Sequence, residues 1–357
     1  MQFAPRFAIC VLIAMALWPQ TSQATVARGQ FKMIDSGFPA EDFWPTAWID
    51  NDRILFTGVV LGTTCDRAGG ACSFRGVLNA MYVWHVKSNR VARYRDRIFS
   101  ELCVQEGYVS YRAREQVNDV LAATYAGQFG DERKVASTNK QWFNPISCKY
   151  HSQQPSWAIR RLAGHDVEPL LERHGYVDYG QVTLGNVREA TGDRRPRLVT
   201  PGGDALPINI ATEHWPTIKH RLRYLPFLGE YFAKGGRDGR TLSQTVVFIT
   251  HTGQTRVFAP RDDRKLGGDY HAVRTGIFVN SGGKDARGTA AGAYLITGAQ
   301  VAPILSGALS SVSVSPSGCH VAFVYATSLD AISEGYRAWK RGEVANTLRV
   351  IDVCRGE

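Results

Sequence analysis

Acid–base chemistry in this chain would draw on three polar residues, Glu101, His271 and Arg274. Glu101 and His271 begin segments expected to be innermost β-strands, and Arg274 follows His271 closely. A carboxylate, an imidazole and a guanidinium around one central channel would bind an anionic or polar ligand, or serve as acid and base. The alternative role is structural, in which the same groups hydrogen-bond neighbouring units and keep them in register. The spacing leaves both roles open, because it does not show that the three groups are close in space.

Known catalytic motifs are absent from the sequence: it has no GxSxG elbow, no HExxH and no EF-hand loop. The stretch GIFVNSGGKD, Gly276 to Asp285, invites a P-loop interpretation. Asp285 follows Lys284, however, where a P-loop needs Ser or Thr to hold magnesium, and the spacing is also wrong. A glycine-rich hairpin connection explains it better. The sequence therefore predicts no catalytic residue, no metal site and no cofactor.

The first 24 residues have the organisation of a signal peptide. Arg6 supplies a positive charge, Phe7–Trp18 is an apolar run, and Ser22-Gln23-Ala24 gives the small-x-small pattern of a cleavage site. The run is too short to span a bilayer comfortably, and no later stretch is long enough. We expect cleavage after Ala24, a single domain over residues 25–357, and a periplasmic or secreted location with no transmembrane segment.

Six cysteines remain once Cys10 leaves with the signal peptide, and an even number in an exported chain predicts disulfides. Six cysteines allow 15 pairings. The strand pattern favours the pairs Cys65–Cys72, Cys103–Cys148 and Cys319–Cys354. A zinc site is the weaker alternative, because no CxxC pair occurs.

Glycine and proline are frequent, with 35 and 15 copies, which favours strands joined by turns over long helices. The phrase GYVSY at Gly107–Tyr111 returns as GYVDY at Gly175–Tyr179, and other strand–turn–strand units follow. We interpret them as one all-β domain, a β-propeller of about six four-stranded blades, with five to seven possible. The last unit shows only three strands, so we expect a strand near Arg28–Ile34 to complete it and close the ring.

The expected units can be given by their strands. The first has Phe43–Ile49, Ile54–Val60, Met81–Val86 and Val91–Arg95; the second Phe99–Val104, Tyr108–Arg112, Val120–Tyr125 and Lys134–Ser137; the third includes Arg197–Thr200 and Ala205–Ile210; the fourth Arg221–Phe227, Tyr231–Ala233, Thr245–Thr250 and Thr255–Phe258; the fifth Tyr270–Arg274, Ile277–Asn280, Ala293–Thr297 and Val301–Leu305; and the last Ser311–Ser315, His320–Tyr325 and Leu348–Val353.

The last unit also resembles a known repeat. Its turn Ser315-Pro316-Ser317-Gly318 and following strand Val321-Ala322-Phe323 are similar to the repeat of TolB-like, WD40-like bacterial propellers, whose turn reads Ser-Pro-Asp-Gly. The chain departs from that pattern at Ser317, and it has no counterpart of the N-terminal α/β domain of TolB. The resemblance implies a propeller fold and an extracytoplasmic setting, and no particular role, because fold does not fix function.

The net charge of +10 favours anionic partners, although the basic residues are dispersed over loops and faces. We expect a monomeric binding or scaffolding module that recognises an envelope protein or an anionic polysaccharide without catalysis; nucleic acid is not an expected partner. The alternative is a propeller-type glycoside hydrolase or lyase acting on anionic polysaccharide. A glycosidase needs two carboxyl groups about 5–10 Å apart, which a sequence does not show.

Overall fold

A computed structural model gives the fold, and it describes residues 31–40, 46–59, 79–105, 107–113, 123–134, 187–188, 194–195, 197–199, 205–207, 223–225, 227–235, 245–250, 252–258, 268–281, 291–298, 300–326 and 346–354. All regular structure in these ranges is β-strand in antiparallel pairing, so the expected all-β class is confirmed. The predicted signal peptide, the second repeat copy at Gly175–Tyr179 and three cysteines (Cys65, Cys72 and Cys148) lie outside them.

The last sheet joins the first and last described strands, and we call it the latch sheet. Its order is β1 (Met33–Pro39), β23 (Thr347–Asp352), β22 (His320–Ala326) and β21 (Ala308–Val314). β1 runs antiparallel to β23, with Ile34 opposite Val350. The prediction that an N-terminal strand completes the last unit is confirmed, although the strand begins at Met33 and not near Arg28.

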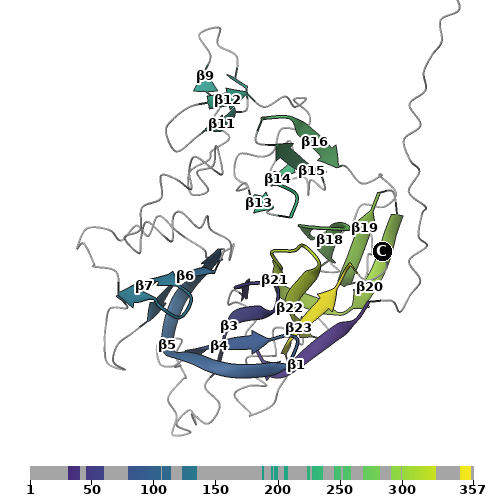
Figure 1. The fold of residues 1–357 in the computed structure, drawn as a ribbon. Coiled ribbons are helices and arrows are strands. Elements are labelled where there is room, and N and C mark those ends of the chain that lie inside the picture. The colour runs from purple at the N-terminus through teal and green to yellow at the C-terminus, as the bar shows by residue number, and fades with distance from the viewer. Residues whose placement is uncertain are drawn as a thin grey trace, which may run out of the picture.

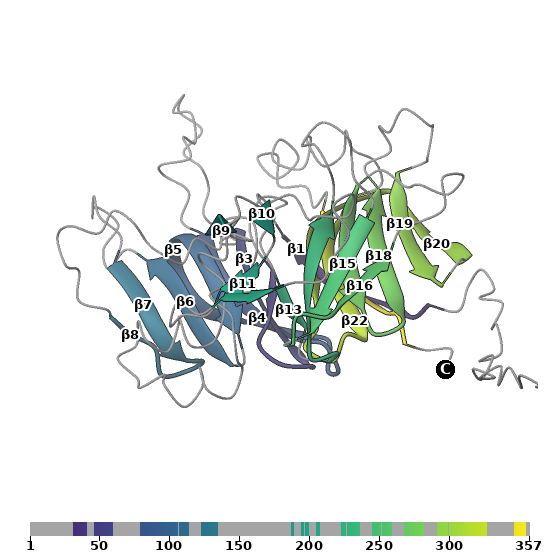
Figure 2. The same ribbon diagram turned by 90° about the horizontal axis from the view of Figure 1, so that it is seen from above.

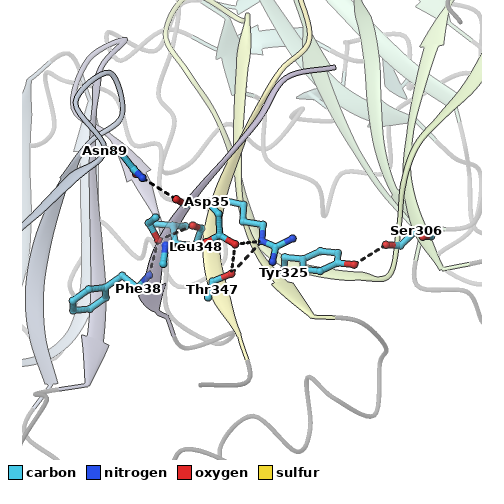
Figure 3. A network of polar contacts seen from close by, with 10 residues as sticks. Asp35, Phe38, Asn89, Ser306, Tyr325, Thr347 and Leu348 are labelled. Carbon is cyan, nitrogen blue, oxygen red and sulfur yellow. Dashed lines mark hydrogen bonds and ion pairs between the residues drawn. The ribbon is translucent and has the colours of Figure 1, made fainter. Parts of the chain in front are cut away.

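Side chains reinforce the position of β1 (Figure 3). The Arg349 guanidinium pairs with the Asp35 carboxylate at 2.8 Å, and it also lies 4.1 Å from the centre of the Tyr325 ring. On the other side, Asn89 donates its side-chain N–H to the Asp35 carbonyl at 3.1 Å. Because Asn89 lies in the turn between strands β4 and β5 of another sheet, β1 contacts both the latch sheet and that sheet.

A seven-stranded sheet, which we call the long sheet, follows β1 in the chain. Its strands in order are β2 (Ala47–Trp48), β3 (Arg53–Val59), β4 (Asn79–His85), β5 (Arg90–Gln105), β6 (Tyr108–Ala113), β7 (Ala123–Gln128) and β8 (Arg133–Lys134). The sequence predicted two separate four-stranded units here. β5 corrects that expectation, because it serves as the fourth strand of the first unit and the first strand of the second.

β5 nevertheless folds back on itself (Figure 1). The Tyr94 ring near its start stacks on Phe129 at 4.7 Å, and the Phe129 N–H donates to the Gly107 carbonyl just past its end at 2.8 Å. A straight strand would hold Tyr94 and Gly107 roughly 40 Å apart. Register shifts between Ile98 and Cys103 supply the bend, as β-bulges do. The unit boundary predicted at Ile98–Phe99 is therefore a bulged corner and not a chain break.

Two further four-stranded sheets have the strands expected for the fourth and fifth units. One contains β13 (Arg223–Leu225), β14 (Glu230–Gly235), β15 (Thr245–Thr250) and β16 (Thr255–Phe258); the other contains β17 (Asp269–Val273), β18 (Gly276–Ser281), β19 (Gly292–Thr297) and β20 (Gln300–Ser306). In the sequence, two strand pairs lie between the long sheet and these two sheets. They are β9 (Val187–Arg188) with β10 (Arg194–Arg195), and β11 (Arg197–Val199) with β12 (Ala205–Pro207). The β11–β12 hairpin matches the strands predicted there, so the third unit is described in part.

Successive sheets pack face to face, and each interface has its own apolar cluster (Figures 1 and 2). In β22, Val321 and Phe323 face the β17–β20 sheet, whereas Ala322 and Val324 face the long sheet. Side chains alternate across a strand, so a strand between two sheets must be apolar on both faces. This explains the unbroken apolar run VAFV.

The same arrangement holds in β3, where Ile54 and Phe56 face the latch sheet and Leu55 faces the second half of the long sheet. The packing order is therefore β13–β16, β17–β20, latch sheet, and first and second halves of the long sheet. This succession fits a propeller, while the blade number and the closing of the ring stay predictions. In the described residues, no helix has the length and apolar character needed to span a membrane.

Candidate functional site

The three residues predicted to line a channel lie in two different sheets. Glu101 is in β5, in the part that pairs with β6, and its side chain lies outside the described residues. His271 is in β17, partly buried, opposite Phe278 in the neighbouring strand. The structure gives His271 and Arg274 a common hairpin and leaves Glu101 in the long sheet. A ligand-binding role for the three remains a prediction.

Arg274 lies in the turn between β17 and β18, where it holds the latch sheet. Its backbone N–H donates to the Gly318 carbonyl at 2.9 Å, and its Nε donates to the Ser317 carbonyl at 2.9 Å. These bonds are the register-keeping contacts that the sequence offered as the alternative role.

The inner edge of the latch sheet is also engaged by its neighbours. β21 pairs with β22 on one side only, so carbonyls on its other edge need donors from elsewhere. The donors are Asn280 Nδ2 to Leu309 O at 3.0 Å, Thr46 Oγ1 to Ser311 O at 2.5 Å, and Trp48 Nε1 to Ser313 O at 3.1 Å. Side chains from the β17–β20 sheet and the long sheet thus occupy three carbonyls of this edge.

The turn between β21 and β22, Ser315–Cys319, is a meeting point that we call the hub turn. Its Ser317 N–H donates to the Asn51 carboxamide oxygen at 2.8 Å, and Arg274 donates to its carbonyls from another sheet. The Phe227 ring, from the β13–β14 turn, lies so close that a Cβ on Gly318 would be 2.7 Å from it. Turns from three other parts of the chain therefore contact one turn of the latch sheet.

The position of the hub turn follows from these contacts. The sheet that carries Phe227 and the latch sheet are separated by the β17–β20 sheet, which packs between them. Turns of two sheets with a third between them meet only where the sheets converge. The hub turn therefore lies where these sheets converge.

Ser315, His320 and Asp352 have the residue types of a hydrolase triad but not its geometry. The Ser315 hydroxyl accepts a hydrogen bond from the His320 backbone N–H at 3.0 Å, and not from the imidazole ring. Ser315 is 1% exposed, and the His320 Nε2 lies 3.9 Å from the Asp352 carboxylate. A triad needs the imidazole to take the hydroxyl proton. These contacts fix the hub turn and do not activate a nucleophile.

A partly buried polar cluster in the long sheet was not expected from the sequence. The Tyr94 hydroxyl donates to the Glu132 carboxylate at 2.6 Å and accepts from the Gly130 N–H at 3.0 Å. Arg95 lies over the Tyr125 ring at 4.4 Å and hydrogen-bonds the Tyr111 hydroxyl at 2.5 Å. Nothing in the sequence links the arginine-rich start of β5 to the β7–β8 turn.

Both tyrosines of this cluster hold their protons firmly. Burial, followed by the hydrogen bond to the Glu132 carboxylate, raises the pKa of Tyr94 above its ordinary value. Burial and then the Glu132 charge likewise raise the pKa of Tyr111, although Arg95 opposes the shift. A phenol with a raised pKa is a hydrogen-bond donor and a poor base. The cluster therefore pins the β7–β8 turn onto β5.

The strand ends that short turns join and the strand ends that longer connections join lie on opposite sides of the sheets. In an antiparallel meander, the first-to-second and third-to-fourth connections share one end and the second-to-third connection leaves from the other. The short turns are residues 49–52, 86–89, 106–107, 129–132, 226–229, 251–254, 274–275, 298–299 and 315–319; the longer connections are residues 60–78, 114–122, 236–244, 282–291 and 327–346. We call the two sides the tight-turn end and the long-connection end; the hub turn is at the tight-turn end.

Ligand groups for a metal ion do not cluster in the part of the chain that the structure describes: no three His, Cys, Asp or Glu side chains gather there. The predicted disulfide Cys319–Cys354 is present, with the Cα atoms 5.0 Å apart. Cys103 lies in β5, with its side chain outside the described residues. Disulfides of the other four cysteines stay predictions.

Comparison with known proteins identifies no family. No family model and no curated protein matches the chain. Similar solved structures include an oligogalacturonate lyase in complex with manganese (9% identity, 88% of this chain, 66% of that chain, TM-score 0.24), TolB from Acinetobacter baumannii (10%, 92%, 64%, 0.25) and the β-propeller domain of the trilobed protease from Pyrococcus furiosus (7%, 81%, 78%, 0.26).

The chain thus spans less than two thirds of the length of that lyase and of TolB. At such identities and TM-scores these likenesses carry no argument about activity. The all-β description stands on the strands and their pairing.

Proposed function

We propose that this protein is an exported binding module of the β-propeller type, which holds an envelope protein or an anionic polymer at its long-connection end without catalysing a reaction. The observation that carries the proposal is the separation of short turns and long connections to opposite ends of the sheets. Binding residues concentrate on connections that a rigid scaffold positions.

The contacts at the tight-turn end also support a binding surface at the long-connection end. Its hub turn is engaged by Asn51, Arg274 and Phe227 in contacts between sheets. Groups committed to holding sheets together are poorly placed to exchange those contacts for a partner.

Two further observations support the exported location and the anionic partner. The Cys319–Cys354 disulfide suits an oxidising compartment, where such bonds persist. The net charge of +10 draws anionic partners by long-range attraction. For an anionic polymer, that attraction weakens as salt is added.

Replacing connections tests the proposal. Residues 236–244 and 282–291 are each replaced with a short Gly-Ser turn in the tagged protein, and retained partners are measured by capture and mass spectrometry. Affinity for an anionic polysaccharide is measured at low and high salt. We expect at least one replacement to abolish capture or polymer binding, while the tight-turn variants Lys87→Ser and Leu228→Ser keep both.

Two results would overturn the proposal. Loss of binding in the tight-turn variants alone would move the binding surface to the other end. Turnover of a polysaccharide by the purified protein would replace a binding module with the glycoside hydrolase or lyase alternative.

A further inference from the structure

We propose that the Cys319–Cys354 disulfide is a thiol-sensitive lock on the hub turn, so that its reduction by a dithiol uncouples the latch sheet from the sheets that meet it there. The inference is independent of the proposed function, because it concerns the isolated protein. It rests on the contacts of the hub turn and on the segment to which the disulfide ties it.

Cys319 is the last residue of the hub turn, and Cys354 lies two residues after the end of β23. The disulfide thus joins the hub turn to the segment after β23. The Val353 N–H donates to the Cys319 carbonyl at 2.8 Å, beside the disulfide. The Thr275 hydroxyl donates to the Val353 carbonyl at 3.1 Å, which brings in the β17–β18 turn.

β23 ends two residues before Cys354, so the covalent bond secures a segment that the sheet does not hold. When the disulfide opens, three hydrogen bonds remain in this segment: the Val353 N–H to the Cys319 carbonyl, the Thr275 hydroxyl to the Val353 carbonyl, and the Cys354 N–H to the Asp352 carboxylate at 3.0 Å. The Val353 side chain is buried, so Cys354 is the residue that the covalent bond chiefly secures. Hydrogen bonds at the end of a strand open more easily than those in its interior. The bonds from Ser317 and Arg274 depend on the hub turn keeping its position.

The chemistry is thiol–disulfide exchange, and both cysteines are partly exposed. A thiolate of the dithiol attacks one sulfur, forms a mixed disulfide and releases the other cysteine as a thiolate. The second thiol of the reagent, as its thiolate, displaces the remaining cysteine. The disulfide of the protein takes up two electrons and two protons and becomes two thiols, and the dithiol is oxidised to a disulfide.

Hydrogen exchange at single amides measures whether the hub turn is released from the neighbouring sheets. The reporters are the Arg274 N–H, bonded to the Gly318 carbonyl, and the Ser317 N–H, bonded to the Asn51 side chain. The reference is the Val247 amide in the interior of β15. On treatment of the folded protein with dithiothreitol, we expect both reporters to exchange at least about tenfold faster while the reference keeps its rate.

Other disulfides must be separated from this one. In the variant Cys319→Ala with Cys354→Ala, the reporters should exchange fast from the start, and dithiothreitol should change them no further. If that variant does not fold, mass spectrometry of the wild-type protein during reduction shows which disulfide has opened, and the reporters must follow Cys319–Cys354. Unchanged reporters after this bond opens, or equal acceleration of Val247, would overturn the proposal.

Discussion

At the scale of single residues, Gly318 is needed both for the backbone conformation of the hub turn and for the packing of another sheet against it. Its φ of +76° is a conformation that residues with a Cβ rarely adopt. The Phe227 ring occupies the space where a side chain would begin. Glycine is therefore required twice at this position, by the turn and by the close approach of another sheet.

Replacing Gly318 with alanine should be costly, and Gly37 provides a matched control. Gly37 has a similar φ of +64°, but no other atom lies within 4 Å of the place where a Cβ would stand. Gly37→Ala should cost roughly 1–2 kcal/mol for the backbone, and Gly318→Ala roughly 2–5 kcal/mol because the Phe227 ring must also move. Urea unfolding measures both. Equal costs would contradict the packing of Phe227 on the hub turn.

Tyr94 should make stability sensitive to alkaline pH. Its folded pKa is raised by burial and then by the Glu132 hydrogen bond, so its contribution is fully present below the unfolded pKa of about 10. That contribution falls as the pH rises above this value. Tyr94→Phe should lower the unfolding free energy by about 1–3 kcal/mol at pH ~8, because the carboxylate loses a partner. The variant should then lose less stability up to pH ~11 than the wild type; parallel curves would contradict this account.

The turn Ser315–Gly318 was predictable from sequence because proline and glycine act on the backbone locally. Its contacts with Asn51, Phe227 and Arg274 were not, because these residues lie far from it in sequence. Arg274 shows the limit most clearly: the sequence left a ligand role and a register-keeping role open, and the structure adds two hydrogen bonds from Arg274 to the hub turn. Long-range pairing of side chains leaves no local pattern.

At the scale of elements, β1 shows how a terminal strand is fixed. Its pair Asp35–Arg349 is partly buried, with 40% and 21% of the two side chains exposed. The pair Asp131–Arg133 is a natural comparison, with 76% and 81% exposed and a distance of 3.6 Å. Exposed pairs contribute little because water and salt screen them.

Arg349→Met should therefore lower the unfolding free energy by roughly 1–2 kcal/mol, because the ion pair and the contact with the Tyr325 ring are both lost. Arg133→Met should change it by less than about 0.5 kcal/mol. Urea unfolding of the two variants under the same buffer gives the comparison. A larger loss in Arg133→Met would contradict the assignment of the latch contacts.

Strand positions were predicted well wherever apolar runs are bounded by turn residues, as in β15, β18 and β22. The sequence analysis assigned the residues of β5 to two strands, Val91–Arg95 and Phe99–Val104, in two different units. The segment from Arg90 to Gln105 contains neither glycine nor proline, so it has no local signal for a break. Its bend comes from bulges, which depend on pairing with β4 and β6.

At the scale of the whole molecule, alternating burial sets the order of the sheets. Central strands that are apolar on both faces must lie between two neighbours, and the four clusters show which neighbours those are. The order of the strands places the short turns between described strands at the tight-turn end, and the proposed binding surface is at the other end. Internal repeats in a sequence predict such an arrangement of sheets. They do not show which end of the sheets carries the contacts between sheets.

Site-specific photo-crosslinking in the native envelope tests the central claim most directly. A photoreactive residue replaces Arg240 or Ala286 in the long connections, or Lys87 or Leu228 at the tight-turn end, and adducts are identified by mass spectrometry. If the binding surface is at the long-connection end, we expect adducts with one partner from a long-connection probe and none from the tight-turn probes. Adducts with that partner from Lys87 or Leu228 alone would contradict it and place the binding surface on the hub side.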